Sequence, residues 1–299
     1  MEQFISTLFN GLSLSSIILL TSIGLAITFG LMKVINMAHG EFVMIGAYVT
    51  YVVQEFFKQY FSGSDLYYFA AIPVAFIVTF LLGSLLEKVV ISKLYGREID
   101  SLLATFGISL VLQQLARSIF GSQGVNVTAP SFLKGGLTLG GVTFSYNRLF
   151  IIVMVMICLL ILWVVMYKMN FGRQMRAVMQ NRTMARCMGI NSRRVDNVTF
   201  ALGSGLAGIA GCSVALLGSV DSTIGQSYIV NSFMAVVLGG VGKLLGTVIG
   251  SGMIGFTSIF TENYTSSSIA KALVLLLVIA FLQKRPQGLF LIRSRNLDE

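Results

Sequence analysis

The sequence predicts an all-α membrane protein, a polytopic bundle of about eight or nine transmembrane segments that includes short or broken helices. Hydrophobic residues fill 55% of the 299 positions and charged residues only 11%, which is too little charge to cover a soluble domain of this length. The mean hydropathy is +0.83. Apolar runs long enough to cross a bilayer follow one another, and no series of short alternating segments indicates a membrane β-barrel.

The individual elements follow from the apolar runs between charged or turn-forming stretches. No basic patch or small-residue cleavage site marks the first run, so we expect a retained span and not a cleaved signal peptide. The run at 229–241 is too short to cross a hydrocarbon core of roughly 30 Å as a helix, which indicates a half-helix or a re-entrant segment. The candidate spans are 9–31, 38–57, 67–88, 101–120, 148–167, 197–219, 229–241, 244–262 and 268–284.

We expect residues 1–299 to form a single transmembrane domain whose orientation is set by its basic residues. Sixteen of the 21 Lys and Arg residues lie at the turn at Lys33, in loops 88–100 and 168–197, at Lys243 and in the tail after 284. The positive-inside rule makes that side cytoplasmic. The N-terminus and loop 121–147 are then outside, and the C-terminus is cytoplasmic. The net charge of +9 reflects this topology, so we expect no nucleic-acid partner.

Two glycine patterns match nucleotide-binding motifs only superficially. The stretch GSGLAG at 203–208 fits G-x-G-x-x-G but lies inside a membrane span, without the βαβ unit that such a fingerprint needs. The stretch GGVGK at 239–243 lacks the upstream glycine and the following Ser or Thr of a Walker A loop. If this protein uses ATP, another chain must bind it.

The same glycines favour close helix packing. Ser204 and Gly208, Ala207 and Gly211, and Gly246 and Gly250 form small-xxx-small patterns that let helix backbones approach each other. Thirteen glycines between residues 203 and 255 indicate tight, bendable or broken helices. Broken helices at membrane depth commonly line a solute route.

The span 101–120 carries a polar residue at every fourth position, which places a polar stripe on one helical face. The stripe consists of Ser101, Thr105, Ser109, Gln113 and Arg117. Two interpretations remain open. The stripe either forms hydrogen bonds between helices, worth about 0.6 kcal/mol each, or lines the path of a polar solute.

The stretch INMAHGEFVMIGAY at 35–48 holds the only histidine of the chain, His39, close to Glu41. A metal site would need further His, Cys or carboxylate ligands, and the three cysteines, Cys158, Cys187 and Cys212, are scattered. We therefore expect no metal site and no catalytic residue. Asn36 either caps the following helix, with Glu41 near its positive end, or the carboxylate faces a solute path. His39 and Glu41 both follow the turn at Lys33, so we expect them to lie nearer the inner side of the membrane than the outer side.

The cytoplasmic stretch 171–194 predicts two short helices, at 173–180 and 183–188, with Gly189 as a stop signal. Both helices are basic and have an apolar side that is rich in methionine. Such helices either rest on anionic lipid or dock to a cytoplasmic partner, since methionine-rich surfaces adapt well to other proteins.

Four stretches resemble the permease subunits of branched-chain amino-acid-type ABC importers, and the resemblance extends from about residue 10 to 292. Within that family, the chain resembles most the urea-transporter branch. The pattern departs from the family at Asn231 and Lys243. The four stretches are GLAITFGLMKVINMAHGEFVMIGAYVTYVV, GRQMRAVMQNRTMARCMGINSRRVDNVTFALGSGLAGIAG, GQSYIVNSFMAVVLGGVGKLLGTVIGS and QKRPQGLF.

The resemblance implies a multi-pass subunit of the bacterial inner membrane, which transports solute and is not itself an enzyme. Its implied partners are a second homologous permease, two cytoplasmic ATPase subunits that carry ATP and Mg²⁺, and a periplasmic substrate-binding protein. Loop 171–194 matches the stretch through which such permeases engage the ATPase. The docking residues are then Arg173, Arg176, Asn181, Arg182, Met184, Ala185, Arg186, Met188 and Gly189.

The implied mechanism is alternating access driven by ATP, with urea as the expected solute. A branched-chain amino acid or a short amide is the alternative solute. An ATP-independent channel or an ion-coupled secondary transporter is the alternative class. Urea offers both donors and an acceptor, so hydroxyl and carboxamide groups suit it. The expected pathway residues are Asn36, His39, Glu41, Thr105, Ser109 and Gln113.

Overall fold

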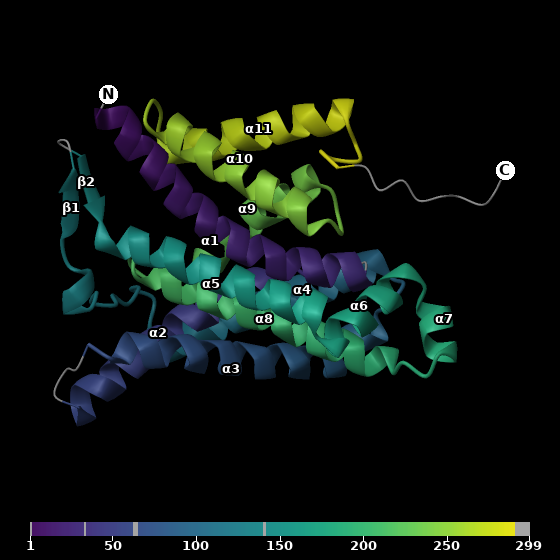
Figure 1. Cartoon of the computed structure of the whole chain (residues 1–299). Coiled ribbons are helices and arrows are strands. Elements are labelled where there is room, and N and C mark those ends of the chain that lie inside the picture. Colours follow the sequence, from purple (N-terminus) through teal and green to yellow (C-terminus); the bar gives the residue numbers. More distant parts are fainter. Residues whose placement is uncertain (1, 33, 62–64, 140–141, 291–299) are drawn as a thin grey trace.

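The computed structural model describes residues 2–32, 34–61, 65–139 and 142–290, and it confirms a nearly all-α bundle (Figure 1). The long helices are α1 (Glu2–Met32), α2 (His39–Tyr60), α3 (Tyr67–Val89), α4 (Glu98–Phe120), α5 (Tyr146–Lys168), α8 (Ser192–Ala215), α9 (Ile224–Gly239), α10 (Leu244–Glu262) and α11 (Ser267–Lys284). The shorter elements are α6 (Asn170–Gln180), α7 (Arg182–Cys187), the 3₁₀ turns η1 (Ile91–Lys93) and η2 (Ser131–Leu133), and the strands β1 (Gly136–Leu139) and β2 (Val142–Ser145).

Helix α8 lies at the centre of the bundle and packs against α1, α2 and α3. All its residues from 203 to 215 are buried, and most are Gly, Ala or Ser. These small side chains let neighbouring backbones touch. A β-carbon added at Gly24 of α1 would lie 2.6 Å from the carbonyl oxygen of Gly203. Close backbone approach therefore holds α8 in place, as small residues do in membrane bundles.

The glycines and the serine in the small-xxx-small patterns all lie at such contacts. Three of them are on α8 and face α2 or α3, and two are on α10 and face α9. The pairs are Ser204 with Gly83, Gly208 with Gly46, Gly211 with Val43, Gly246 with Gly239 and Gly250 with Ala235.

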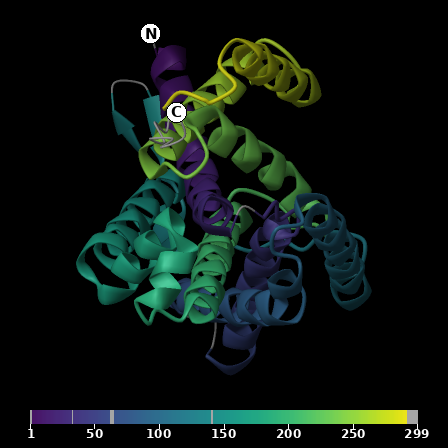
Figure 2. The ribbon, with the colours of Figure 1, turned by 90° about the vertical axis from the view of Figure 1, so that its right-hand side faces the viewer.

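Helix α1 divides the helices into two groups. In Figure 2, α9, α10 and α11 lie above it, and α2, α3, α5 and α8 lie below it. The contacts agree, because α1 packs on α8 and α5 on one side and on α10 and α9 on the other. Helix α4 lies at the periphery and packs chiefly on α2.

Among the described residues, seven helices are long and apolar enough to cross a membrane. The sequence predicts nine segments, and the two others differ for physical reasons. Helix α9 has only 16 residues, as expected for a half-helix. Helix α2 has 22 residues but carries His39, Glu41, Gln54 and Glu55 towards its ends, which lowers its hydropathy.

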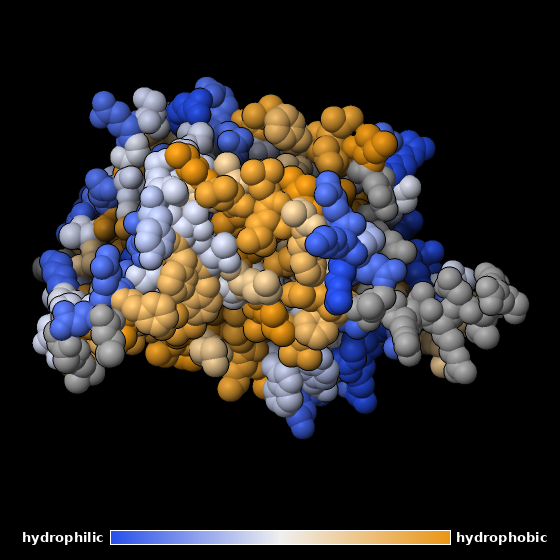
Figure 3. Space-filling model, turned by 90° about the horizontal axis from the view of Figure 1, so that it is seen from above, coloured by the Kyte–Doolittle hydropathy of each residue, from blue (hydrophilic) through white to orange (hydrophobic). Residues whose placement is uncertain are grey.

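The bundle has two distinct ends. The start of α1 and the β1–β2 hairpin share one end, and α6, α7 and the end of α11 share the other (Figure 1). This grouping matches the charge pattern, but which end faces the cytoplasm stays a prediction. Lys33, Arg293 and Arg295, which contribute to that pattern, lie outside the described residues. On the face seen in Figure 3, an apolar belt lies between two hydrophilic ends. The long helices also carry exposed leucines such as Leu81 and Leu276, which suit contact with lipid.

Loop 121–147 folds back onto the bundle. It contains the antiparallel hairpin of β1 and β2, in which Leu137 is opposite Phe144. Val125 pairs with Val220 in an isolated bridge. The carbonyl of Thr128 accepts hydrogen bonds from Tyr67 and Gln54. The loop is therefore fixed to α2, α3 and the start of α9 and forms no domain of its own.

Candidate functional site

Helix α2 begins inside the bundle. After α1 ends, residues 34–38 run back along it without regular structure, so His39 lies beside the middle of α1. The Nε2 atom of His39 is 3.1 Å from the carbonyl oxygen of Thr21, which places the ring proton on Nε2. Gly40 lies against Gly225 at the start of α9. His39 thus packs against the second half of α1, and its position nearer the inner side stays a prediction.

Asn36 forms a turn before α2 and does not cap the helix. Its Oδ1 atom accepts a 3.0 Å hydrogen bond from the amide of Ala38, and Ala38 itself is the N-cap residue, without a side-chain cap. The expectation of an Asn36 cap is therefore wrong. The reason is local: the side chain binds an amide two residues later, as asparagine commonly does in turns.

Glu41 lies in the first turn of α2 and joins this helix to α4. Its Oε1 atom accepts hydrogen bonds from Ser109 Oγ at 2.7 Å and from Gln113 Nε2 at 2.8 Å. The side chain is only 1% exposed. The positive end of α2 further favours a carboxylate here. Ser109 and Gln113 therefore partner a buried acidic group that belongs to another helix.

The remaining stripe residues have different partners. Thr105 Oγ1 accepts a 3.1 Å hydrogen bond from the amide of Met37 and donates to the carbonyl of Ser101 at 2.8 Å. Arg117 is exposed, and its Nε donates to Ser222 at 3.2 Å. The stripe thus contacts the segment before α2 and the connection between α8 and α9, while its central part surrounds the Glu41 carboxylate of α2.

Among the residues that the structure describes, three polar atoms of this segment find no hydrogen-bond partner: Asn36 Nδ2, His39 Nδ1 and Glu41 Oε2. All three side chains are 1% exposed. Buried polar atoms are costly unless water or a ligand satisfies them. With His39 as the Nε2–H tautomer, the set offers one donor and two acceptors, which suits a small molecule with both kinds of group.

The residues described in the structure hold no group of three His, Cys, Asp or Glu side chains that could bind a metal ion. Cys158 and Cys212 are buried and Cys187 is exposed, and none forms a disulfide. The groups that the cluster around Glu41 can present to a solute are therefore hydrogen-bond donors and acceptors and one carboxylate.

The expected docking loop forms the two short helices α6 and α7. Met175 and Val178 of α6 are buried against the bundle. Asn181 caps α7 by accepting a 3.0 Å hydrogen bond from the amide of Met184, and Gly189 ends the segment with φ +80°. Met184 and Met188 are 63% and 81% exposed, so they present apolar surface beyond the bundle.

Other docking-loop residues hold α7 to the bundle. Ala185 is buried. Arg182 pairs with Asp196 of α8 and lies 4.9 Å over the ring of Tyr95. Arg186 Nε donates to Ser192 at 2.7 Å. The remaining two residues, Arg173 and Arg176, lie on α6, where Arg173 donates to the side chain of Asn170 and Arg176 donates to the carbonyl of Met166.

The sequence analysis missed a buried acidic group at this end of the bundle. Glu87 of α3 is 3% exposed and accepts hydrogen bonds from Tyr95 at 2.6 Å and from Asn197 of α8 at 2.8 Å. Burial and then the Glu87 hydrogen bond raise the pKa of Tyr95, so its hydroxyl stays protonated and donates. An acidic residue within an apolar span was the signal that could have identified it. Through Tyr95 and Arg182, this network connects α7 to α3 and α8.

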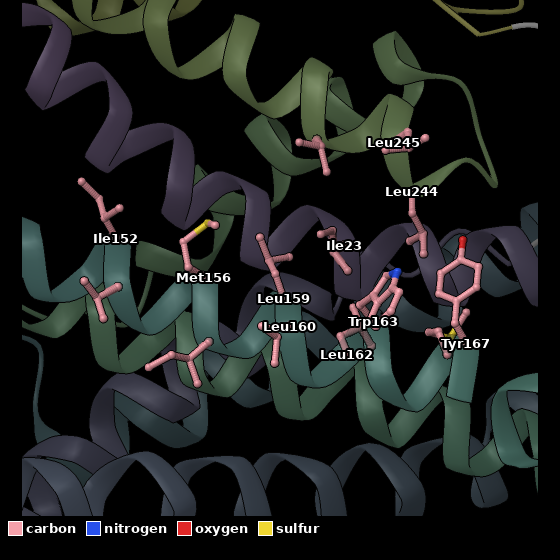
Figure 4. Close-up of a pocket in the computed structure, with 14 residues that line it drawn as sticks. Ile23, Ile152, Met156, Leu159, Leu160, Leu162, Trp163, Tyr167, Leu244 and Leu245 are labelled. Atoms are coloured by element: carbon pink, nitrogen blue, oxygen red, sulfur yellow. The ribbon is translucent and has the colours of Figure 1, made fainter. Parts of the chain in front are cut away.

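An apolar groove of about 770 Å³ runs along α5 (Figure 4). It is lined by residues such as Met156, Leu160 and Trp163 of α5, Ile23 of α1 and Leu245 of α10. Its lining is almost free of polar groups, so it suits acyl chains or an apolar helix and not a polar solute.

A protein-family model described as "Branched-chain amino acid transport system / permease component" matches residues 7–282. The chain belongs to this family. The resemblance seen in the sequence is thereby confirmed at the level of the family, and the chain is a permease component.

Several curated permeases of the family match almost the full chain. The high-affinity branched-chain amino acid transport system permease protein BraD of Pseudomonas aeruginosa is 28% identical, over 96% of this chain and 95% of its own. The corresponding LivH protein of Escherichia coli K12 is 27% identical with the same coverage. A probable LivH of Methanocaldococcus jannaschii is 28% identical over 92% of this chain and 89% of its own. No solved structure matches the chain significantly.

Proposed function

We propose that this permease forms part of the transport path of an ATP-driven importer whose solute is a branched-chain amino acid. The observation that carries the proposal is the match over residues 7–282 to a family described by that transport system. The relatives named above are high-affinity branched-chain amino acid permeases and match this chain along almost its full length.

The sequence resemblance alone suggests urea as the solute. The comparisons with known proteins favour a branched-chain amino acid instead. The cluster around Glu41 fits the same choice. An α-amino acid carries an ammonium group, and the unpartnered Glu41 Oε2 and His39 Nδ1 atoms are acceptors for it. Asn36 Nδ2 is a donor for the carboxylate. Urea and short amides carry no positive charge that could offset the desolvation cost of the buried Glu41 carboxylate.

Access to the cluster requires a movement, and α4 is the element that provides it in our proposal. Helix α4 lies at the periphery and packs chiefly on α2. Its bonds to Glu41 and to residues 35–37 join it to the site. Displacement of α4 would expose Glu41 and Asn36, as alternating access requires of a site at membrane depth.

The partners that we propose are a second homologous permease, two cytoplasmic ATPases with ATP and Mg²⁺, and a periplasmic binding protein, all at the bacterial inner membrane. The exposed Met184 and Met188 form the ATPase contact, and the Glu87 network transmits it to α3 and α8. The end of the bundle with α6 and α7 is then cytoplasmic, and the start of α1 is outside.

Uptake into proteoliposomes tests the function. The chain is purified with its co-expressed partners and reconstituted, and uptake of labelled leucine, urea and acetamide is measured with ATP and with a non-hydrolysable analogue. We expect leucine uptake that needs ATP hydrolysis and the binding protein. Urea or acetamide uptake without leucine uptake would overturn the solute. Uptake that is independent of ATP would indicate a channel or a secondary transporter.

A further inference from the structure

A polar cleft of about 250 Å³, which shares no lining residue with the cluster around Glu41, lies at the end of the bundle that carries the β1–β2 hairpin. It is formed by the starts of α5, α9 and α11 and the end of α10. Charged side chains from three of these helices, Arg148, Glu262 and Lys271, line it. Charged groups within membrane helices are costly and commonly mark a solute path.

Arg148 is the anion-binding group of this cleft. It lies in the first turn of α5 and is half-buried. Within the described residues it has no hydrogen bond and no ion pair, although the cleft also holds a carboxylate. A partly desolvated guanidinium whose five N–H donors lack protein partners matches a carboxylate in a bidentate geometry.

Glu262 supplies the opposite charge from the end of α10. Its Oε1 atom accepts a 2.9 Å hydrogen bond from Ser267, and no Lys or Arg in the described structure pairs with it. Tyr228 interacts electrostatically with both Arg148 and Glu262, which indicates that the two charges face the same space. Lys271, 3.5 Å from Ser227, adds an exposed positive charge at the rim.

The remaining wall is part polar, with Ser227, Asn231 and Ser258, and part aliphatic. Leu14, Leu217 and Ile259 line the cleft beside the charged groups. The volume lies just under the range of about 300 to 1,000 Å³ that is typical of drug-sized ligands, so the cleft suits a smaller molecule. Its lining therefore combines a site for a carboxylate, a site for an ammonium group and an aliphatic surface.

We propose that this cleft binds a zwitterionic aliphatic amino acid, with its carboxylate on Arg148, its ammonium group on Glu262 and its side chain on Leu14 and Ile259. This proposal rests on the proposed function, because it makes the cleft the first binding site for solute that enters from outside. It adds a second site, separate from the cluster around Glu41.

Direct binding to the purified permease complex in nanodiscs, without the binding protein, tests the cleft. Labelled leucine is the probe. Unlabelled leucine, 4-methylpentanoate, isopentylamine and urea are the competitors. 4-Methylpentanoate carries only the carboxylate, isopentylamine carries only the ammonium group, and urea carries no charge. We expect only leucine to compete strongly. R148Q and E262Q should each weaken leucine binding by about tenfold or more, as the loss of a charge-assisted hydrogen bond does. R148K should weaken it less.

The control is R285Q, which removes an exposed guanidinium just after α11, at the opposite end of the bundle and outside the lining of the cleft, and should leave binding unchanged. Unfolding temperatures identify any variant that is misfolded. If R148Q is misfolded, leucine binding by the R148K and E262Q variants tests the cleft instead. Leucine binding that is equal in the wild type, R148Q and E262Q would overturn the cleft site, as would no binding at all. Uptake by the wild-type complex is measured separately, so failure of leucine import would refute the proposed function and not the binding result.

Discussion

Glu41 and Gln113 are 72 residues apart in the sequence, yet they meet between α2 and α4 through a hydrogen bond of 2.8 Å. With Ser109, this contact surrounds one oxygen of a carboxylate that is 1% exposed. The other oxygen finds no hydrogen-bond partner in the described part of the chain. A buried carboxylate that is only half satisfied stabilises a bundle less than apolar packing would. Its presence is therefore better explained by transport than by architecture.

Replacing Glu41 with Gln tests that explanation. Glutamine keeps an oxygen that can accept from Ser109 and Gln113 but removes the charge that an ammonium group would need. We expect leucine uptake to fall at least about tenfold, the equivalent of about 1.4 kcal/mol, with little change in unfolding temperature. The matched control is E55Q in the same helix, where the glutamate is exposed and pairs with Lys58. Equal uptake by E41Q and E55Q would exclude Glu41 from the path.

Gln113→Leu tests the structural part of the same contact. Leucine removes a donor from a buried carboxylate, and hydrogen bonds to charged groups contribute roughly 1.5 to 3 kcal/mol. We expect a loss of stability in that range, measured by denaturation in detergent. Combined with E41Q, the loss should shrink because the charge is gone. Additive effects would show that Gln113 and Glu41 act independently.

Uptake tests the lining itself. If neither Gln113→Leu nor Asn36→Leu changes uptake, the proposed lining is wrong.

The sequence pattern could predict that Ser109 and Gln113 share a helical face, because their spacing is four residues. It could not predict that Glu41 is their partner, since that contact depends on how residues 34–38 fold back beside α1. The small residues at 204, 208 and 211 predicted close contacts, but the helices that meet them, α2 and α3, follow only from the assembled bundle. Glu87 was missed because neither partner follows from its helix: Tyr95 lies in the connection between α3 and α4, and Asn197 is 110 residues further along the sequence.

Gly208→Ala should destabilise the bundle although alanine favours helices. A β-carbon at this position would lie 2.8 Å from Cγ2 of Thr79 and 2.9 Å from the carbonyl oxygen of Ala75, so α3 would have to move. We expect a loss of about 1 to 3 kcal/mol, typical of overpacking. Gly107→Ala in α4 is the control, because nothing lies within 4 Å of a β-carbon there. It should gain roughly 0.5 to 1 kcal/mol. Equal unfolding temperatures for the two variants would contradict the packing at Gly208.

Tyr95→Phe tests the network around Glu87. The change removes one of the two donors to the Glu87 carboxylate while it keeps the ring under Arg182. We expect ATP hydrolysis to persist but to drive less uptake, because α7 is then less firmly linked to α3 and α8. The ratio of leucine transported to ATP hydrolysed measures this. Tyr264→Phe, at an 86% exposed residue, is the control. An unchanged ratio in Tyr95→Phe would mean that the network only stabilises the fold.

Met184→Glu tests the docking surface. Met184 is 63% exposed and its backbone amide alone contributes to the cap of α7, so glutamate fits the fold without losing a side-chain contact. A new charge in an apolar interface is strongly unfavourable. We expect the ATPase subunits to be lost on purification of the complex, while the permease itself unfolds at an unchanged temperature. Thr143→Glu adds the same charge to the exposed hairpin at the opposite end and should retain the ATPases. Retention by Met184→Glu would place the ATPase contact elsewhere, and loss by Thr143→Glu alone would reverse the proposed orientation of the bundle.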